Sequence, residues 1–572
     1  MIDRDMESVN RDSAVGGGRR TPGGGWLVEN AAVVVLGLVL LAAAAVLLWM
    51  TSGLTYYQDT WAFLMHRRGF TADAFLEPHN EHIVLIPVAI VKLLLAIFGM
   101  TSALPEFVVL IGLLSATAIL VFVYVRRRLG PWPAVIAATL LLFLGPAWQV
   151  LLWPFETGFV GAMMAGIAML LMLEREDRHG DLYACGLLIV SLGFSTLGLS
   201  FALAAFVDVL LGRRDRGLRR AFVFVVPLAL FALWYLGWGH TAESHLTLRN
   251  ILESPRYLLD GLASSLDSVL GLSTIDVGGS GQPDWGRPLL VAAVVLVGYG
   301  QYRRPGFSPR LWPIAAATAS FWLLAGFNYI PGREAVASRY TYAGSVFLLL
   351  LAADLLRGVR FGRAALWVGG AVAAVAVTVN LIPLDDGRDQ LRAQTVFTRS
   401  DLAAMNIAER QIDLSFSLTP DIAGTPSLID VDAAEYFDAK RQYGSPAYTP
   451  KELAGADEVG RRQADIVLAR ALGIAAVLRP DSLLPVGPGC VTIAAGDGAT
   501  RELRLAPGLT RIGLKPGPDG SFSLRRFAVG EYPVATAASP GGSVTLLRIP
   551  RDRVARPWHL QVSASQPAVV CR

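Results

Sequence analysis

The sequence predicts a mainly α-helical polytopic membrane domain of about eleven transmembrane helices, followed by an external α+β domain that ends in a β-sandwich. Of the 572 residues, 53% are hydrophobic and 17% are charged, whereas soluble domains are about a quarter charged. Long apolar runs recur between residues 31 and 382, and many approach the ~20 residues needed to cross a bilayer. After residue 490, short alternating segments with regular turn signals are typical of a sandwich.

The chain divides into four predicted regions. Residues 1–30 are rich in glycine and charge, so we expect a disordered cytoplasmic segment. No small-residue cleavage site precedes the first apolar run, and we therefore predict an uncleaved anchor rather than a signal peptide. The regions that follow are a membrane domain at 31–383, an external helical and linker region at 384–480, and the β-sandwich at 481–572.

Basic residues cluster between the apolar runs, and such clusters mark cytoplasmic loops. If every basic cluster lies on the cytoplasmic side, residues 83–98 must form an interfacial or re-entrant helix rather than a span. Residues 182–211 must then form two short spans, broken at 195–198. The N-terminus then lies inside and the C-terminus outside an inner or plasma membrane. The clusters are residues 19–20, 126–128, 175–178, 213–220, 303–304 and 357–363, and the predicted external loops are 51–104, 148–158, 239–287 and 328–340.

The remaining regions carry further signals. In the third loop, residues 255–270 have a helix-like apolar spacing and are predicted to lie at the membrane interface. Beyond the membrane domain, helices are expected at 385–411 and 461–477, with a turn-rich linker at 443–450. Because the net charge is only +4 and the basic residues lie between spans, we expect membrane lipids rather than nucleic acid as partners.

Two of the three cysteines bracket the strand-rich end of the chain. Cys490 and Cys571 flank a polar region, which predicts one disulfide in an oxidising compartment; the alternative is two unrelated buried thiols. Cys185 lies in a hydrophobic run and is expected to be a small core residue.

The external loops hold the candidate chemistry. Asp59 and Glu156 lie near the outer ends of spans, where a carboxylate can accept a proton from an attacking hydroxyl. Arginine forks and histidines can grip a phosphate, and flat aromatic faces can stack on sugars. These features predict a lipid-phosphate substrate. The candidate phosphate ligands are Arg333, Arg339, Arg67, His79 and His82, and the other candidate substrate contacts are Glu77, Asn80, Glu81, Trp61, Trp153 and Tyr340.

Each assignment has a structural alternative. Asp59 can cap the helix that follows it, Glu156 can pair with an arginine, and Arg333 and Arg339 can anchor at the interface. His79 or His82 can instead bind a divalent metal with Glu81, but this spacing is not diagnostic and the chemistry does not require a metal. Ser195 and Thr196 are expected to hydrogen-bond the backbone freed at the broken span. The sequence contains no Walker loop, dinucleotide fingerprint or zinc-type spacing.

Several motifs occur in an order that resembles the GT-C glycosyltransferases, a family that includes mannosyl-, arabinosyl- and aminoarabinosyltransferases. The motifs are YYQDTW, EPHNEHIVLIP, RRRLGPW, LLFLGPAW, WPFETG and ASRYTYAG, spread over residues 31–382. The resemblance implies that Asp59 deprotonates the acceptor hydroxyl, that Glu156 orients acceptor or donor, and that Arg339, with Arg333, lies near the donor phosphate. The sequence departs from many members in having Gln58 before Asp59 and HNEH in place of His-Pro-Pro.

The resemblance implies an inverting transfer of a sugar from a polyprenyl-phosphate donor to a cell-envelope glycan or glycolipid. The terminal sandwich is similar to the carbohydrate-binding modules that end several arabinosyltransferases. A transporter or flippase of lipid-linked sugars, or a non-catalytic envelope-assembly or glycan-binding protein, is the alternative function. The sugar, the acceptor, the prenyl length and the oligomeric state are left open.

Overall fold

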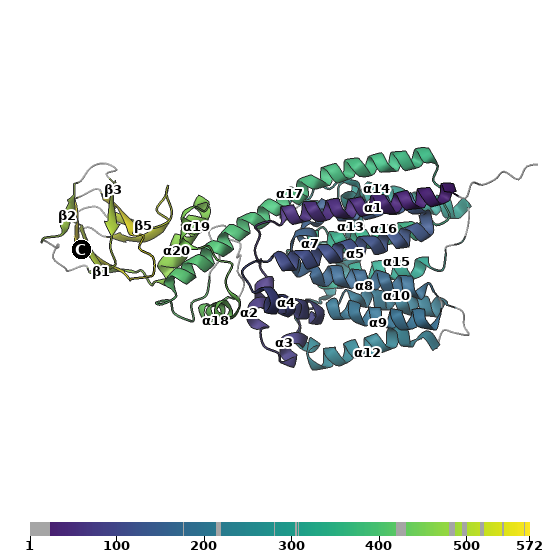
Figure 1. The fold of residues 1–572 in the computed structure, drawn as a ribbon, viewed down its shortest axis with the longest axis horizontal. Helices are drawn as coiled ribbons and strands as arrows, with labels where there is room; N and C mark the ends of the chain where they lie inside the picture. The colour runs from purple at the N-terminus through teal and green to yellow at the C-terminus, as the bar shows by residue number, and fades with distance from the viewer. Residues whose placement is uncertain are drawn as a thin grey trace, which may run out of the picture.

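A bundle of helices carries a smaller domain at one end (Figure 1). We call that end of the bundle the domain-bearing face and the other end the opposite face. The computed structural model describes residues 23–571 except 176, 213–218, 280, 304–305, 307, 419–430, 480–486, 495–499, 515–519, 540–542 and 565–566. The predicted disordered segment up to residue 22, the cluster 19–20 and parts of the clusters 175–178, 213–220 and 303–304 lie outside the described residues.

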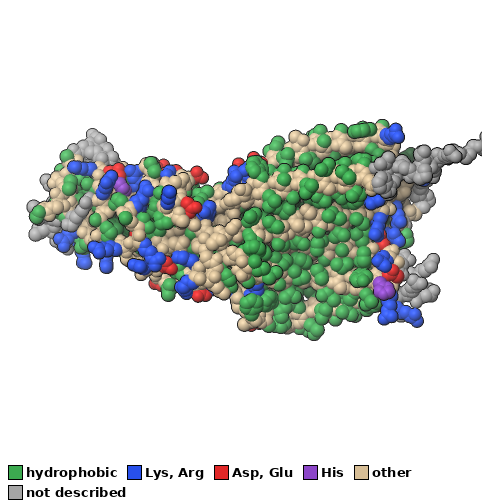
Figure 2. Space-filling model, viewed as in Figure 1, with side chains coloured by type: hydrophobic (Ala, Val, Ile, Leu, Met, Phe, Trp, Pro, Cys, Tyr) green, Lys and Arg blue, Asp and Glu red, His purple; other side chains and the backbone are tan. Residues whose placement is uncertain are grey.

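The bundle is built from apolar helices that lie side by side (Figure 1). Hydrophobic side chains cover most of the visible side of the bundle, and Lys and Arg lie at its opposite face as well as on the second domain (Figure 2). The helices and 3₁₀ turns up to the second domain are α1 (Gly23–Met50), α2 (Thr60–His66), α3 (Ala72–Leu76), α4 (Leu85–Phe98), α5 (Leu104–Leu129), α6 (Pro131–Leu142), η1 (Gly145–Ala147), α7 (Trp148–Leu152), η2 (Pro154–Glu156), α8 (Thr157–Leu173), α9 (Arg178–Phe194), α10 (Gly198–Leu211), α12 (Phe222–Gly237), η3 (Gly239–Thr241), α13 (Leu248–Leu270), α14 (Gly286–Arg303), α15 (Leu311–Phe327), α16 (Ser338–Leu355) and α17 (Arg363–Ala408).

Several of these helices are long and apolar enough to cross a membrane. Within the described residues, four helices are long and apolar enough to cross a membrane, or five if the bent pair of α6 with η1 and α7 is one span. Four further apolar helices, among them α4 and α10, are shorter. The chain is therefore a multi-pass membrane protein, and the count of about eleven spans remains a prediction.

The predicted break in 182–211 is present, since α9 ends at Phe194 and α10 begins at Gly198. The backbone N–H of Leu197 donates to Ser195 Oγ at 3.3 Å, so this serine caps freed backbone as expected. A Cβ on Gly198 would lie 2.7 Å from Leu192 N. The sharp turn therefore requires glycine at position 198.

The prediction of a helix starting at 385 was wrong, because α17 runs without interruption from Arg363 through Pro383 to Ala408. Proline removes one helical hydrogen bond, but close packing against η1 supports the helix there. A Cβ on Gly145 would lie 1.7 Å from Asn380 O, and one on Gly387 would lie 2.4 Å from the Trp148 ring. These glycines allow α17 to continue from the bundle into the second domain.

The second domain packs three helices and two antiparallel sheets on the end of α17. The sheet orders are β1-β7-β4-β9-β2 and β3-β8-β5-β6. The predicted helix 461–477 stops at Ala471, because Gly473 has φ +59° and ends the helix before β1. The elements are α18 (Ala433–Tyr443), α19 (Pro450–Ala454), α20 (Glu458–Ala471), β1 (Ala476–Arg479), β2 (Cys490–Ile493), β3 (Thr500–Leu505), β4 (Gly508–Leu514), β5 (Gly520–Arg525), β6 (Val534–Ser539), β7 (Val544–Ile549), β8 (Trp558–Ala564) and β9 (Ala568–Cys571).

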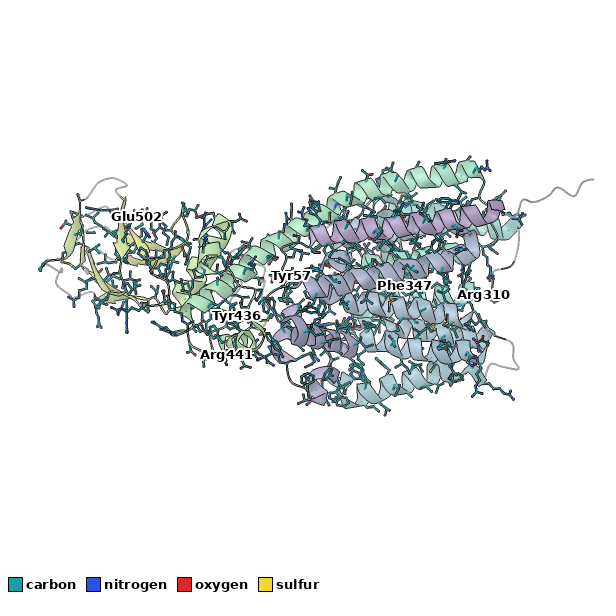
Figure 3. All side chains as sticks on the ribbon, in the orientation of Figure 1. Tyr57, Arg310, Phe347, Tyr436, Arg441 and Glu502 are labelled. Atoms are coloured by element: carbon teal, nitrogen blue, oxygen red, sulfur yellow. A yellow bond between two sulfur atoms is a disulfide. The ribbon has the colours of Figure 1, made fainter. Side chains whose placement is uncertain are left out.

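The second domain contacts the loop after α1. Glu435 Oε2 of α18 lies 3.2 Å from His66 Nε2, and Tyr443 O accepts from Met100 N at 2.7 Å. In Figure 3, Tyr57 lies where the bundle meets this domain, with Tyr436 close by in α18, whereas Arg310 lies at the opposite face. The second domain therefore supports the first loop from outside the bundle.

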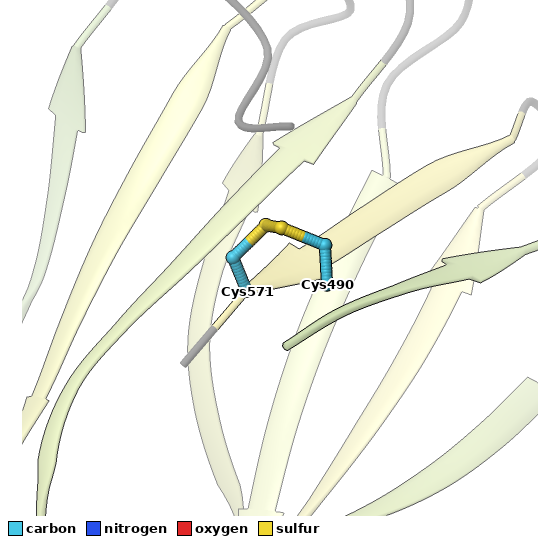
Figure 4. The surroundings of a disulfide bond; sticks show 2 residues. All are labelled: Cys490 and Cys571. Carbon is cyan, nitrogen blue, oxygen red and sulfur yellow. A yellow bond between two sulfur atoms is a disulfide. The ribbon is translucent and has the colours of Figure 1, made fainter. Parts of the chain in front are cut away.

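Cys490 and Cys571 form the predicted disulfide, and they are directly opposed residues of β2 and β9 (Figure 4). Disulfides stabilise mainly by restricting the unfolded chain. We expect the double variant Cys490→Ser/Cys571→Ser to lower the unfolding free energy of the sandwich by about 2–4 kcal/mol, measured by thermal denaturation in nanodiscs. Cys185→Ser, at the buried free thiol, is the control; equal melting of double variant and wild type would contradict the expectation.

Candidate active site

The loop after α1 places Asp59 at the start of α2 without using its carboxylate as a cap. Asp59 occupies the N-cap position, but its side chain makes no capping hydrogen bond. Gln58 has φ +40° and Asn80 has φ +50°, and these are the only non-glycine residues with positive φ in the described part of the chain. Each adjoins a candidate site residue, Asp59 or His79. Backbone strain of this kind gathers at functional sites.

The EPHNEH segment folds into a tight turn. His79 and His82 exchange backbone hydrogen bonds at 3.0 Å in both directions, which brings their side chains to one end of the turn. Arg67 donates from Nη1 to Glu77 O and from Nη2 to Pro78 O, both at 2.8 Å. Arg67 is buried at 6% exposure and does not line the pocket described next. Its donors therefore support the turn, and the structure does not place it as a phosphate ligand.

Two carboxylates, those of Asp59 and Glu156, line a pocket with about 580 Å³ of empty space, counted with the open solvent at its mouth. His79 Nε2 approaches Asp59 Oδ1 to 3.4 Å. Glu156 lies at the end of η2 and is buried at 4% exposure. No hydrogen bond or ion pair joins the Glu156 carboxylate to another described residue, although Arg339 and Asp59 are its electrostatic neighbours. Neither alternative, a helix cap for Asp59 nor an arginine pair for Glu156, is seen.

Two arginines, Arg333 from the connection between α15 and α16 and Arg339 from the start of α16, also line this pocket. Arg333 Nη1 donates to Glu81 Oε1 at 2.6 Å. Arg339 donates from Nη2 to Gly332 O at 2.9 Å, and no carboxylate of the described residues lies in salt-bridge range of it. Burial raises the pKa of Glu81, but His82 and Arg333 together hold this pKa below its usual value. Arg333 is thus neutralised, and Arg339 is the arginine that retains uncompensated charge at the pocket.

Three buried polar atoms around this pocket lack hydrogen-bond partners within the described residues. They are Arg339 Nε, Glu81 Oε2 and His79 Nε2, the last of which lies 3.4 Å from Asp59 Oδ1 but outside hydrogen-bond geometry. Buried polar atoms in folded proteins nearly always have a partner. One imidazole nitrogen, one guanidinium nitrogen and one carboxylate oxygen around the same cavity therefore indicate a site for a polar ligand.

An apolar groove of about 1,100 Å³ adjoins the polar pocket. Its apolar lining comes from α8, α10, α12 and α15, and Tyr235 in it is 51% exposed on the bundle surface. Glu81, His82 and Tyr340 line both the groove and the polar pocket. The two cavities are therefore adjacent. The aromatic and aliphatic lining residues are Phe159, Leu197, Leu199, Phe231, Trp234, Tyr235, Phe321 and Leu324.

His82 lies where the pocket and the groove meet, and its Nδ1 contacts Thr196 Oγ1. Burial, helped by Arg333, His79 and Arg339 and opposed by Glu81, lowers the pKa of His82 to about 4. The imidazole is therefore neutral at pH 7 in the ligand-free protein. The Thr196 hydroxyl was expected to hydrogen-bond the backbone freed at the break. In the structure it contacts His82 instead.

The lowered pKa of His82 predicts a pH effect on stability. As the pH falls from about 6.5 toward 4, the unfolded chain binds a proton at this histidine while the folded protein does not. Wild-type melting temperature should therefore fall over this range, and the fall should be smaller in His82→Gln. His240→Gln, at an exposed histidine, is the control. Identical pH dependence of wild type and His82→Gln would contradict the assignment.

The remaining predicted contacts divide between the pocket and the core. Asn80 and Tyr340 line the pocket, whereas Glu77 is exposed away from it. Trp61 is fully buried and donates to Tyr56 O at 3.2 Å. Trp153 is buried at 3% and donates to Tyr57 O at 3.2 Å. Both tryptophans therefore pack beneath the site and offer no face to a sugar.

Sequence reasoning missed the aromatic residues that do line the pocket. Phe155 lies 5.2 Å from the His79 ring and Phe159 lies 5.4 Å from the His82 ring, between ring centroids. Phe155 lies in the WPFETG segment and Phe159 follows it directly, so the motif was a usable signal but indicated the wrong aromatic residue. Among the described residues, no three His, Cys, Asp or Glu side chains are grouped as metal ligands.

The fold and the pocket define a multi-pass helical membrane protein with a polar site at its domain-bearing face and an apolar groove beside it. No known family model matches the sequence, and no curated protein matches it. Among solved structures, the chain is similar to ArnT from Cupriavidus metallidurans bound to undecaprenyl phosphate, with 13% identity, a TM-score of 0.43 and coverage of 74% of this chain and 86% of that chain. It is likewise similar to the apo state of that ArnT, with 13% identity, a TM-score of 0.42 and coverage of 80% and 97%.

Proposed function

We propose that the protein is a membrane glycosyltransferase that moves a sugar from a polyprenyl-phosphate donor to a glycan or glycolipid acceptor at the domain-bearing face. One observation supports this proposal: a pocket lined by Asp59, Glu156 and Arg339 adjoins an apolar groove. These two cavities suit a substrate whose sugar and phosphate occupy the polar pocket and whose long hydrocarbon chain lies in the groove.

The proposed reaction is a single displacement with inversion at the anomeric carbon. The acceptor oxygen forms a bond to that carbon as the bond to the phosphate oxygen breaks, and Asp59 takes the proton of the acceptor hydroxyl. The polyprenyl phosphate leaves with the bonding electrons, and Arg339 stabilises its growing charge. Glu156 orients the acceptor or the donor sugar beside Asp59. Neutral His82 and the pair of Arg333 with Glu81 shape the pocket without adding net charge.

The distribution of charge gives the proposed orientation. Within the bundle, basic side chains lie mainly at the opposite face (Figure 2), where Arg127 and Arg128 pair with Glu174 at 2.8 and 2.7 Å. Cytoplasmic loops carry the excess of Lys and Arg, and the disulfide of the second domain suits an oxidising compartment. We therefore place the opposite face in the cytoplasm and the reaction on the extracytoplasmic side of the cell membrane.

Sugar transfer in nanodiscs tests the proposal. A panel of polyprenyl-phosphate-linked labelled sugars is incubated with the protein and with crude cell-envelope glycans as acceptors. Release of free polyprenyl phosphate together with labelled glycan is the expected result. Movement of the lipid-linked sugar across the membrane without transfer would instead indicate a flippase, and binding without transfer or movement would indicate a non-catalytic protein.

A further inference from the structure

A second hollow lies beside the candidate active site. It encloses about 1,470 Å³ of space open to solvent and is lined by α13, by Gln282 and Pro283 of the loop that follows, and by the connection between α15 and α16. None of its lining residues lines the candidate active site. We call it the α13 hollow.

Helix α13 presents two adjacent stripes. Leu248, Leu252 and Leu259 form an apolar stripe and are 72%, 71% and 55% exposed. One residue further along the helix, the charged stripe of Arg249, Glu253, Arg256 and Asp260 lines the hollow. This pattern is typical of a helix at the boundary of hydrocarbon and water. The α13 hollow therefore faces water at the level where a membrane-attached substrate would lie.

Both arginines of the hollow are paired with carboxylates. Arg249 Nε donates to Glu253 Oε1 at 2.9 Å, and Arg256 Nε lies 3.6 Å from Asp260 Oδ2. Among the described residues, Glu334 Oε1 accepts only from the backbone N–H of Gly332, at 2.9 Å, so its carboxylate adds a negative charge. A hollow without an unpaired cation favours a neutral polar ligand over an anion such as a phosphate. The candidate active site, with uncompensated Arg339, has the opposite character.

Two aromatic rings give the hollow a feature of saccharide sites. Tyr257 and Tyr329 both line it, and their ring centroids are 6.1 Å apart. Rings of this kind pack against the apolar faces of sugars, while the surrounding carboxylates and guanidinium groups can hydrogen-bond hydroxyls.

One wall is shared with the candidate active site. Gly332 and Glu334 line the α13 hollow, whereas Arg333 between them lines the active-site pocket. Tyr257 donates from its hydroxyl to Arg333 O at 2.8 Å, and Arg339 donates to Gly332 O at 2.9 Å. The backbone that holds the proposed phosphate ligand is therefore the rim of the hollow.

We propose that the α13 hollow is a saccharide subsite that binds the part of an extended neutral acceptor glycan remote from the reacting hydroxyl. This inference rests on the proposed function for its role in transfer, but saccharide binding itself can be measured separately. The acceptor would cross the rim at Gly332 so that its terminal hydroxyl reaches Asp59.

Paramagnetic broadening of sugar signals tests binding without requiring activity. A nitroxide is attached at Asp284→Cys, an exposed position next to Pro283, or at Arg357→Cys on the opposite face, both in a Cys185→Ala background in nanodiscs. The probes are neutral hexasaccharides of mannose, arabinose and glucose. At least one should be broadened more by the label at 284 than by the label at 357, and Tyr329→Ala should abolish that difference. Tyr302→Ala, at a tyrosine 84% exposed on α14, should preserve it.

The outcomes separate the subsite from the proposed function. Equal broadening from both labels with all three hexasaccharides, or broadening that survives Tyr329→Ala, overturns the subsite. Selective broadening that Tyr329→Ala removes supports it, even if no donor sugar is ever transferred. Where transfer is observed, Tyr329→Ala should raise KM at least several-fold for the hexasaccharide and leave KM for the matching disaccharide unchanged. An equal change for both lengths contradicts the subsite and leaves the proposed function intact.

Discussion

Asp59→Asn is expected to lower the rate of sugar transfer by about 10²–10⁴-fold, the range that general-base catalysis usually contributes. The substitution keeps the shape of the side chain and removes its basicity. The Asp59 carboxylate makes no helix-capping bond, so its loss should cost the fold little. Donor affinity should stay nearly constant, because Arg339 and the apolar groove would bind the phosphate and the chain. Single-turnover transfer and donor binding, measured on the same nanodisc preparation, check both parts.

Asp457→Asn is the matched control for this prediction. Asp457 also occupies an N-cap position without a side-chain capping bond and is exposed in the second domain, away from the pocket. It should transfer sugar at the wild-type rate. Wild-type transfer by Asp59→Asn would show that another group accepts the proton. Equal losses in Asp59→Asn and Asp457→Asn would indicate a general defect of folding.

Arg339→Ala is expected to reduce transfer on the order of 10²-fold, as the loss of one preorganised donor to a developing oxyanion does elsewhere. The guanidinium of Arg339 has a buried Nε without a partner and no carboxylate in salt-bridge range among the described residues. Its charge is therefore free to act on a leaving phosphate. Arg339→Lys should recover only part of the loss, because an ammonium keeps the charge but not the planar fork. Rates with saturating donor provide the measurement.

Arg392→Ala controls for the loss of one positive charge. Arg392 is exposed on α17 and lies outside the pocket and the groove. Its substitution should leave donor affinity and transfer unchanged. If Arg339→Ala behaved like Arg392→Ala, the phosphate would have to bind elsewhere.

The sequence was sufficient to predict that the charged groups of the pocket lie together on one face of the membrane domain. Asp59, His79, Glu81, Glu156 and the two arginines come from loops that the basic clusters placed on one face, and the structure brings them together. The placement follows from topology, because charged groups between spans must lie at one membrane surface or the other. The break between α9 and α10 was predicted for a similar local reason, since Gly198 and Ser195 are suited to a turn.

Side-chain direction and tertiary support were not predictable. Nothing in the sequence distinguishes Trp153, which packs into the core, from Phe155 two residues later, which lines the pocket. Arg67 looked like a phosphate ligand until its donors were seen to bind carbonyls of the turn. The helix through Pro383 depends on Gly145 in a distant segment, and no local pattern contains that contact.

A structure by cryo-electron microscopy of Asp59→Asn with the transferred donor tests the central claim most directly. We expect the donor phosphate within hydrogen-bonding distance of Arg339, the sugar beside position 59, and the prenyl chain along the groove formed by Phe231, Trp234 and Phe321. A lipid whose phosphate lies away from Arg339, for example in the hollow around Arg128 and Arg220 at the opposite face, would contradict it.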